Sequence, residues 1–274
     1  MLVTSQDISH WYSYYRRTGY LKWLFGSSFV QASLFAGTTM PAPAVAGDNT
    51  SGTYLAGQYY DIRPTTGDGA RNQTSVDEII ARTPTKMDAD AVPILSAAPV
   101  TRTAAMGTLG VRLSSEPTIE RVKLQAPWNA LGYRTEFLSF GLEGVNDDTG
   151  FNTRRELMDR LLTWLDDELT ITPPAGPILF SAGADAPITI TVQASTSITT
   201  TTTGFHNSIV RYRWDFGDGT PIQVTAGPSA VHGYRQLGTY QVYVEAIDAY
   251  SHHAVAGPIM VSVGSRIYLP FVSR

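Results

Sequence analysis

The chain contains 274 residues, enough for one large domain or two of ordinary size, and 43% of them are hydrophobic, as in a folded protein. A net charge of −4 without any basic run argues against a nucleic-acid partner, and the absence of cysteine excludes thiolate catalysis, Cys-based zinc sites and disulfides. No apolar stretch reaches the roughly 18 residues needed to span a bilayer, and no motif indicates a cofactor.

Residues 1–170 are predicted to form an α/β domain with an open, mostly parallel sheet, because short apolar runs alternate with helical patterns. Helices are expected over 14–25, 75–81 and 154–168. Thr153 and Glu156 have the spacing of a capping box at the start of the last helix. The expected strands are 2–5, 29–34, 92–96, 110–113, 122–125 and 135–140.

Residues 16–46 imitate a signal peptide, with a pair of arginines, an apolar run and a small-residue cleavage site. Polar residues interrupt the apolar run, and a Tyr-rich segment precedes it. This pattern favours a folded helix followed by a strand.

Polar residues follow two of the expected strands of the first domain. Gln6 and Asp7 come after the first strand, and Glu143, Asp147 and Asp148 come after the strand at 135–140. Ligands bind at the carboxyl ends of strands in open α/β sheets. Paired carboxylates perform acid–base chemistry, but they also occupy ordinary loops before helices, where the helix dipole favours negative charge. We favour the second interpretation and keep a hydrolase or peptidase-associated active site as the alternative.

A Pro-rich linker is predicted at residues 171–177, where the composition changes and prolines disfavour helix. Beyond it, residues 178–265 are predicted to form an all-β, immunoglobulin-like sandwich. Residues 188–192, 210–216 and 240–246 alternate between apolar and polar, as half-buried strands do. Residues 266–274 are expected to be a C-terminal tail.

Three ordered segments of the second domain resemble the signature of PKD (polycystic kidney disease) domains. They read W-D-F-G-D-G-T, H-G-Y and G-T-Y-Q-V-Y-V. The resemblance implies a non-catalytic immunoglobulin-like sandwich used for adhesion, spacing or substrate contact. The residues that carry it are Trp214, Asp215, Phe216, Gly217, Asp218, Gly219, Thr220, His232, Tyr234, Gly238 and Tyr240.

The residues of the first segment also have a direct physical interpretation. Trp214 and Phe216 are expected to face the core, and burial of each contributes about 2–3 kcal/mol. The Asp218-Gly219 dipeptide is typical of a turn, and Gly217 is expected at a bulge. Asp215 and Asp218 are either turn-stabilising carboxylates, the interpretation that we favour, or ligands of a calcium ion.

The first domain resembles more loosely the accessory glutamine-amidotransferase-like (flavodoxin-like) domain of exported bacterial subtilisin-like peptidases. The resemblance rests on residues 2–8, residues 137–143 and the helix through Trp164 and Leu165. An amidotransferase needs a nucleophilic cysteine, and this chain has none, so that catalysis is excluded.

These observations favour a non-catalytic accessory region of an exported bacterial protein, outside the cell or at its surface. Its partner is expected to be an extracellular protein or polysaccharide, and a peptidase domain of a longer precursor is expected upstream. A third possibility is an adhesin that contacts its ligand through exposed aromatic side chains, with Tyr243 and Tyr250 as candidates. His252 and His253 are expected in a solvated turn, with a weak surface metal site as the alternative.

Overall fold

The structure is a computed structural model, and it describes residues 1–4, 18–31, 44–47, 54–63, 76–83, 90–98, 106–124, 132–180, 187–196 and 207–264. The chain divides into two compact units, each discontinuous in the sequence. Unit 1 comprises Met1–Glu116, Leu131–Asp167 and Thr200–His206, and unit 2 comprises Pro117–Ala130, Glu168–Thr199 and Asn207–Arg274.

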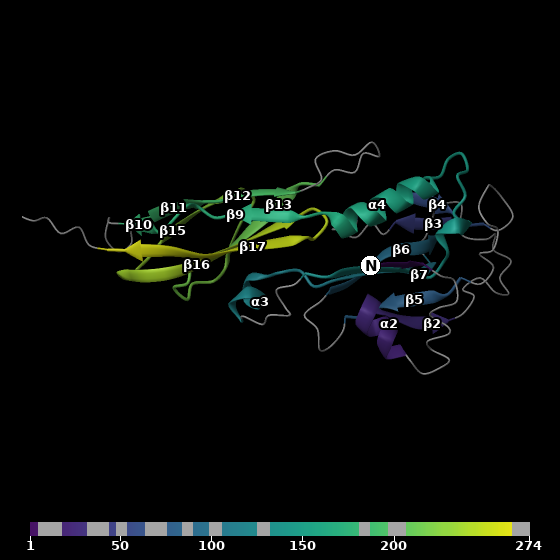
Figure 1. Cartoon of the computed structure of the whole chain (residues 1–274), viewed down its shortest axis with the longest axis horizontal. Coiled ribbons are helices and arrows are strands. Elements are labelled where there is room, and N and C mark those ends of the chain that lie inside the picture. Colours follow the sequence, from purple (N-terminus) through teal and green to yellow (C-terminus); the bar gives the residue numbers. More distant parts are fainter. Residues whose placement is uncertain are drawn as a thin grey trace, which may run out of the picture. The chain divides into compact units, whose positions relative to one another are not determined.

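An eight-stranded sheet forms the centre of unit 1 (Figure 1). Six strands follow the order β1-β8-β7-β6-β3-β4, and β5 pairs with both β2 and β7. Among the described strands of this sheet, β1 and β8 are the only parallel neighbours. The strands are β1 (Leu2–Thr4), β2 (Ser27–Gln31), β3 (Ala44–Gly47), β4 (Tyr59–Asp61), β5 (Glu78–Ala81), β6 (Asp90–Ala98), β7 (Met106–Ser114) and β8 (Arg134–Leu138).

The prediction of a mostly parallel, flavodoxin-like sheet is therefore wrong. Consecutive strands β6 and β7 pair directly with each other, as antiparallel neighbours do, whereas a parallel pair needs a crossover connection of about a dozen residues or more. The runs at 92–96, 110–113 and 135–138 do lie in strands, but a run alone does not reveal its direction in the sheet. The resemblance to an amidotransferase-like domain is not supported by this topology.

Two further elements differ in type from the prediction. Residues 78–81 form strand β5 where a helix was expected over 75–81. Helix α3 (Ile119–Lys123) includes residues 122 and 123, the first two of the strand expected over 122–125. Both segments are short, and short apolar runs fit either period. Their partners in the fold decide their conformation.

Helices α2 (Thr18–Phe25) and α4 (Arg154–Asp166) lie on opposite faces of the sheet of unit 1 (Figure 1). The alternation of side chains along β7 and β8 explains this arrangement. Phe137 faces α2, where its ring centroid lies 5.4 Å from that of Phe25. The neighbouring Arg112 faces α4, where its guanidinium lies 4.9 Å from the ring centroid of Trp164.

Helix α4 begins with the capping box that the sequence predicts. The Thr153 hydroxyl accepts a hydrogen bond from the Glu156 backbone N–H, and the Glu156 carboxylate accepts one from the Thr153 N–H at 2.7 Å. Leu157, Leu161 and Trp164 are buried on one side of this helix. A short 3-10 helix, η1 (Leu142–Gly144), lies between β8 and α4.

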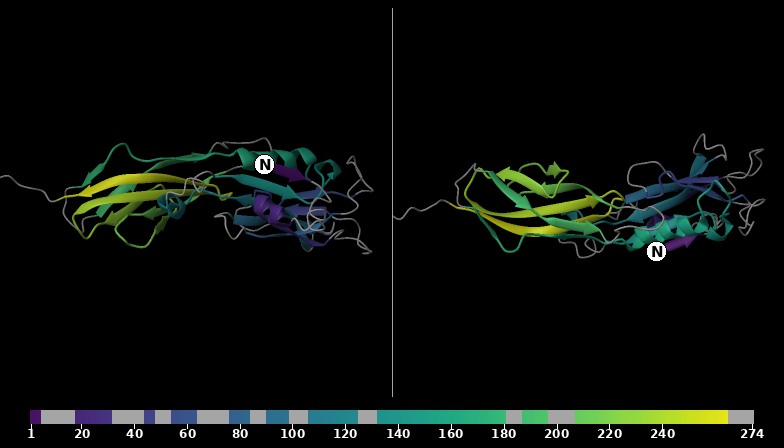
Figure 2. Two further views of the ribbon diagram at one scale, coloured as in Figure 1. Left: turned by 60° about the horizontal axis from the view of Figure 1, so that its bottom comes forward. Right: turned by 90° about the horizontal axis from the view of Figure 1, so that it is seen from above.

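Unit 2 is a two-layer β-sandwich (Figure 2). One layer is a five-stranded sheet in the order β10-β17-β16-β13-β14, and the pairs β11-β15 and β12-β9 supply the remaining strands. The strands are β9 (Leu169–Thr172), β10 (Ile178–Phe180), β11 (Pro187–Thr191), β12 (Gln193–Thr196), β13 (Ile209–Asp215), β14 (Gln223–Thr225), β15 (Ser229–Gly233), β16 (Gly238–Asp248) and β17 (His253–Val263).

The all-β sandwich predicted for the second domain is confirmed, but its edge differs. Residues Leu169–Thr172 form β9 and pair with β12, so part of the predicted linker is a strand of the sandwich. The core unites Ile188 and Ile190 of β11 with Trp214 of β13 and Val244 of β16. The predicted tail, residues 266–274, lies outside the described residues.

The interior of unit 1 contains a buried carboxyl group with a hydrogen bond from the described part of the chain to only one of its two oxygens. Glu136 is fully buried on β8, and its Oε1 accepts a hydrogen bond from the Tyr54 hydroxyl. Its Oε2 has no hydrogen-bond partner among the described residues. Burial raises the pKa of Glu136 to about 8, although Tyr54 and the Arg112 guanidinium act in the opposite direction. The carboxyl group is therefore protonated in the folded unit at neutral pH.

Replacement of Glu136 by Gln should remove a pH dependence of the stability of unit 1. The pKa of Glu136 is raised from 4.5 to about 8, so the unfolded chain loses this proton before the folded chain does. The free energy of unfolding of the wild type should therefore fall between these two values, by about 1.4 kcal/mol per pH unit at most. Glu136→Gln should lack this fall and be the more stable protein at about pH 9.

Urea unfolding followed by hydrogen exchange of the β7 and β8 peptides, at several pH values, measures the effect in unit 1 alone. Glu143→Gln, at an exposed position, is the matched control and should behave as the wild type does. Parallel pH profiles for Glu136→Gln and wild type would contradict the assignment of a protonated carboxyl.

Candidate functional site

The signature segment begins on strand β13 and places its aromatic side chains in the core of unit 2. Trp214 is fully buried and Phe216 nearly so, and their rings are stacked with centroids 6.4 Å apart. The Trp214 indole N–H donates to the Thr225 hydroxyl at 2.9 Å, so the polar atom of the buried ring is satisfied. The prediction that Trp214 and Phe216 face the core is confirmed.

The chain turns sharply after β13, and the two aspartates stabilise this turn. The Oδ1 atom of Asp215 accepts the Gly217 N–H at 2.9 Å, and Oδ1 of Asp218 accepts both the N–H and the hydroxyl of Thr220, at 3.1 Å and 2.6 Å. Gly217 and Gly219 have φ angles of 73° and 81°, which a residue with a Cβ rarely adopts. The segment 215–220 is thus a turn closed by its own side chains.

His232 and the tyrosines connect this turn to the other two signature segments. The His232 ring lies parallel to that of Phe216 at 4.0 Å, and its Nε2 lies 2.8 Å from Oδ2 of Asp218. The Tyr234 hydroxyl donates to the Phe216 carbonyl at 3.1 Å, and its ring stacks on that of Tyr240 at 4.1 Å. Three segments that are separate in the sequence therefore form one packed cluster at one end of the sandwich.

Electrostatics in this cluster favour an ionised Asp218. Burial alone would raise the pKa of Asp218, but hydrogen bonds from Thr220 and His232 outweigh burial and hold the pKa below its usual value. By contrast, burial raises the pKa of Tyr234, and the nearby Asp218 and Tyr240 raise it further. The tyrosine hydroxyl therefore stays protonated and acts as a donor.

A solvent-open cavity of about 450 Å³ lies beside the turn. Its walls combine turn residues with exposed residues of the loop between β15 and β16, including a guanidinium and an amide. This hollow is an open concave surface with hydrogen-bonding groups and one aromatic ring. It is lined by Asp218, Gly219, Thr220, Pro221, Arg235, Gln236 and Tyr240.

The geometry of the two aspartates favours the turn interpretation over calcium. Oδ2 of Asp215 accepts from the Lys123 ammonium at 2.6 Å, and Oδ2 of Asp218 is in contact with His232. With the backbone donors at the two Oδ1 atoms, each of the four carboxylate oxygens already accepts a hydrogen bond. Four of the donors to these oxygens come from the turn and from the Lys123 ammonium, so the carboxylates are poorly disposed toward a calcium ion.

The acidic group of unit 1 is engaged in structural contacts. Oδ1 of Asp147 accepts the backbone N–H of Arg154, the first residue of α4, at 2.7 Å. Asp148 lies 3.9 Å from Arg63, whose guanidinium is held more closely by the buried Asp61 at 2.7 Å. These contacts agree with the interpretation of this loop as a helix-terminus loop. Glu143 is exposed, and Gln6 and Asp7 lie outside the described residues.

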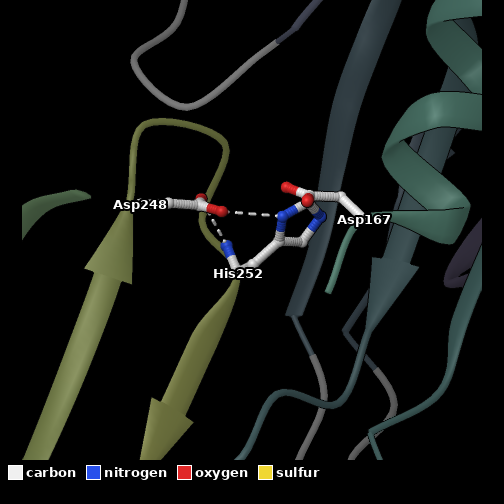
Figure 3. A group of neighbouring side chains, drawn as sticks. All are labelled: Asp167, Asp248 and His252. Atoms are coloured by element: carbon white, nitrogen blue, oxygen red, sulfur yellow. Dashed lines mark hydrogen bonds and ion pairs between the residues drawn. The ribbon is translucent and has the colours of Figure 1, made fainter. Parts of the chain in front are cut away.

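The other aromatic and histidine candidates lie on or near the β16–β17 hairpin. Tyr243 and Tyr250 are partly buried. His252 is fully buried, and its Nδ1 lies 2.8 Å from Oδ2 of Asp248 (Figure 3). Oδ1 of Asp248 also accepts the backbone N–H groups of Tyr250 and His252. The prediction of a solvated turn is therefore wrong for His252, because Asp248 organises this turn from within.

The geometry defines unit 2 as a β-sandwich of the immunoglobulin-like class. Residues 168–259 match the PKD domain family, so this part of the chain is a PKD domain. Human polycystin-1 is 43% identical over 54 residues, which are 20% of this chain and 1% of that protein. The chain thus spans about 1% of the length of this curated relative.

Solved structures to which part of this chain is similar include two PKD domains. The PKD1 domain of the Vibrio cholerae metalloprotease PrtV is 18% identical, and the match covers 35% of this chain and 95% of that one with a TM-score of 0.22. The PKD domain of the human VPS10 domain-containing receptor SorCS2 is 21% identical, with 37% and 75% covered and a TM-score of 0.24.

PKD domains are generally non-catalytic binding or spacer modules and occur in extracellular or secreted proteins. Across the part of the chain that the structure describes, no helix is both long and apolar enough to cross a membrane.

Two glycine substitutions should separate backbone strain from steric clash in the signature turn. Gly217 and Gly219 share a positive φ, but a Cβ on Gly217 would lie 2.4 Å from the Gln241 carbonyl oxygen, whereas a Cβ on Gly219 meets nothing within 4 Å. Gly219→Ala should cost about 1–2 kcal/mol of stability from φ alone. Gly217→Ala should cost a further 1–3 kcal/mol, roughly, because backbone atoms of β16 must move.

The measurement is urea unfolding of unit 2, followed by hydrogen exchange of the β13 and β16 peptides in the full chain. Gly219→Ala serves as the control for φ. Equal losses for the two variants would show that the close approach of Gly217 to β16 has no energetic weight.

Proposed function

We propose that this chain is a non-catalytic binding and spacing region of an exported bacterial protein, and that the cavity beside the signature turn contacts an extracellular polysaccharide. One observation carries the proposal. The signature side chains are used in packing and internal hydrogen bonds, while the loop between β15 and β16 presents Arg235 and Gln236 to solvent at a concave surface. The signature side chains build a scaffold, and the exposed loop supplies the contact.

The chemistry of the cavity suits sugar hydroxyls. A guanidinium offers several fixed N–H donors, and a side-chain amide offers both donors and an acceptor. The ring of Tyr240 adds an apolar wall. Among the described residues, Arg235 has no ion-pair partner within the chain, so its donors are available to a ligand.

A non-catalytic role is supported by the state of the ionisable groups. Asp215, Asp218 and His232 hold the turn, and Asp147 holds the start of α4. A hydrolase would need a carboxylate that acts on a substrate, whereas these carboxylates, including Asp218 at the cavity wall, accept hydrogen bonds from the protein itself. Attachment to a peptidase domain outside this chain stays a prediction.

Retention on insoluble polysaccharides tests the proposal. The full chain is incubated with cellulose, chitin and peptidoglycan, and with collagen as a protein matrix, and the bound fraction is measured. We expect retention on at least one polysaccharide, and the double replacement Arg235→Ala with Gln236→Ala should weaken it about tenfold, since hydrogen bonds to neutral ligands contribute about 1 kcal/mol each.

Arg211→Ala is the matched control, because Arg211 is an exposed arginine of β13 outside the cavity. It should bind as the wild type does. Retention on collagen alone would replace the polysaccharide by a protein partner. Failure on every matrix, or equal binding by the cavity variant, would overturn the assignment of this cavity.

A further inference from the structure

The five-stranded sheet of unit 2 has an outer face that carries several paired charged side chains. Side chains alternate along each strand, so those beside the inward Trp214 and Val244 point away from the core. The register pairs Arg213 with Glu245 and Asp215 with Tyr243 across β13 and β16. We call this surface the outer polar face, formed by Arg213, Asp215, Tyr243, Glu245 and His253.

Glu245 is fully buried although it belongs to the outer polar face. A buried carboxylate is costly unless donors surround it. Three donors do so here. Nη1 of Arg213 lies 2.6 Å from Oε2, Nδ1 of His253 lies 2.6 Å from Oε1, and the backbone N–H of Ile119 donates to Oε2 at 3.3 Å.

The third donor belongs to α3, a short helix of unit 2 that precedes the sandwich in the sequence by many residues. Its first residue, Ile119, is almost fully buried. Thr118 caps the helix by accepting the Arg121 N–H at 3.3 Å. Segment 117–124 therefore covers Glu245 and presents one apolar anchor and one backbone donor to the sheet.

Two charged side chains of α3 match two charges of the outer polar face. The carboxylate of Glu120 lies 2.6 Å from the guanidinium of Arg213. The ammonium of Lys123 lies 2.6 Å from Asp215 and 5.8 Å from the ring centroid of Tyr243. The segment is thus recognised at four points, namely an anchor, a backbone N–H, an acidic side chain and a basic side chain.

The contact between segment 117–124 and the outer polar face differs in composition from the packing of a hydrophobic core. A core contact is dominated by apolar burial, whereas here one isoleucine is accompanied by exposed or half-exposed ion pairs. Such pairs contribute little net stability but give register and specificity. Release of the segment would hydrate Glu245 beside Arg213 and His253 and would leave the sandwich core untouched. In its small apolar area and its exposed ion pairs, the contact therefore resembles a reversible complex between a protein and a short peptide.

We propose that the outer polar face of the PKD domain is a peptide-recognition site, which segment 117–124 of the same chain occupies in cis. Its ligand class is a short peptide with an apolar residue, an acidic residue next to it and a basic residue three positions further on. Glu245 binds the backbone, Arg213 the acidic side chain, and Asp215 with Tyr243 the basic one. The site lies on residues other than those of the cavity, and it does not depend on polysaccharide binding.

The first test asks whether charge alone holds the segment in place. In the full chain, Glu120→Arg combined with Lys123→Glu reverses both ion pairs at positions that are largely exposed, so the fold is not at risk. Hydrogen exchange of the 117–124 peptide should become about tenfold faster, as expected for the loss of two pairs of up to 1 kcal/mol each. Exchange of β13 and β16 should stay as in the wild type.

Leu124→Glu is the control. Leu124 lies in the same segment and is 73% exposed, so this substitution adds a charge that does not contact the outer polar face. It should exchange at the wild-type rate. Unchanged exchange of the segment in the double variant would overturn the proposal.

The second test asks whether the vacated face binds the peptide in trans. A fluorescent peptide with the sequence of residues 116–125 is titrated against each protein, and its anisotropy is measured. The wild type should bind it at least about tenfold more weakly than the double variant, because the tethered segment competes at a high effective concentration.

A peptide that carries the two charge reversals should not bind either protein. Faster exchange of the segment without binding of the wild-type peptide to the double variant would show a covering helix but no recognition site, and would overturn the proposal. Equal binding of both peptides would overturn it as well.

Discussion

Side chains on a strand must point alternately to opposite faces, and unit 2 depends on how strand β13 uses this constraint. The inner positions give Trp214 to the core, where its ring is fully buried. The outer positions give Arg213 and Asp215 to a charged surface, where they meet Glu120 and Lys123. One strand thus fixes the core on one side and the recognition chemistry on the other.

The sandwich and its signature turn could be predicted from the sequence because their determinants are local. Period-two alternation identifies β13 and β16, and Asp218-Gly219 specifies a turn within a few residues. The capping box of α4 was predictable for the same reason. The cavity was not, because Arg235 and Gln236 are exposed loop residues with no pattern around them.

Strand direction in unit 1 and the role of α3 depend on contacts between distant parts of the chain. Ile119 and Glu245 are 126 positions apart, and no local pattern links them. The apolar run around Val122 fits a strand or a helix equally well, and only the outer polar face decides between them. Likewise, the sequence predicts buried strands at β6 and β7, but only their pairing with each other shows that they are antiparallel.

Glu136 and Glu245 are both fully buried glutamates, but they differ in the number of donors that contact their carboxyl oxygens. Glu245 has a guanidinium, an imidazole and a backbone N–H around it, so both of its carboxylate oxygens are engaged. Glu136 has the Tyr54 hydroxyl on one oxygen and no described partner on the other, and it is protonated instead. The number of donors that surround a buried carboxyl group therefore decides its role, and on the outer polar face of unit 2 one of those donors is the backbone N–H of segment 117–124.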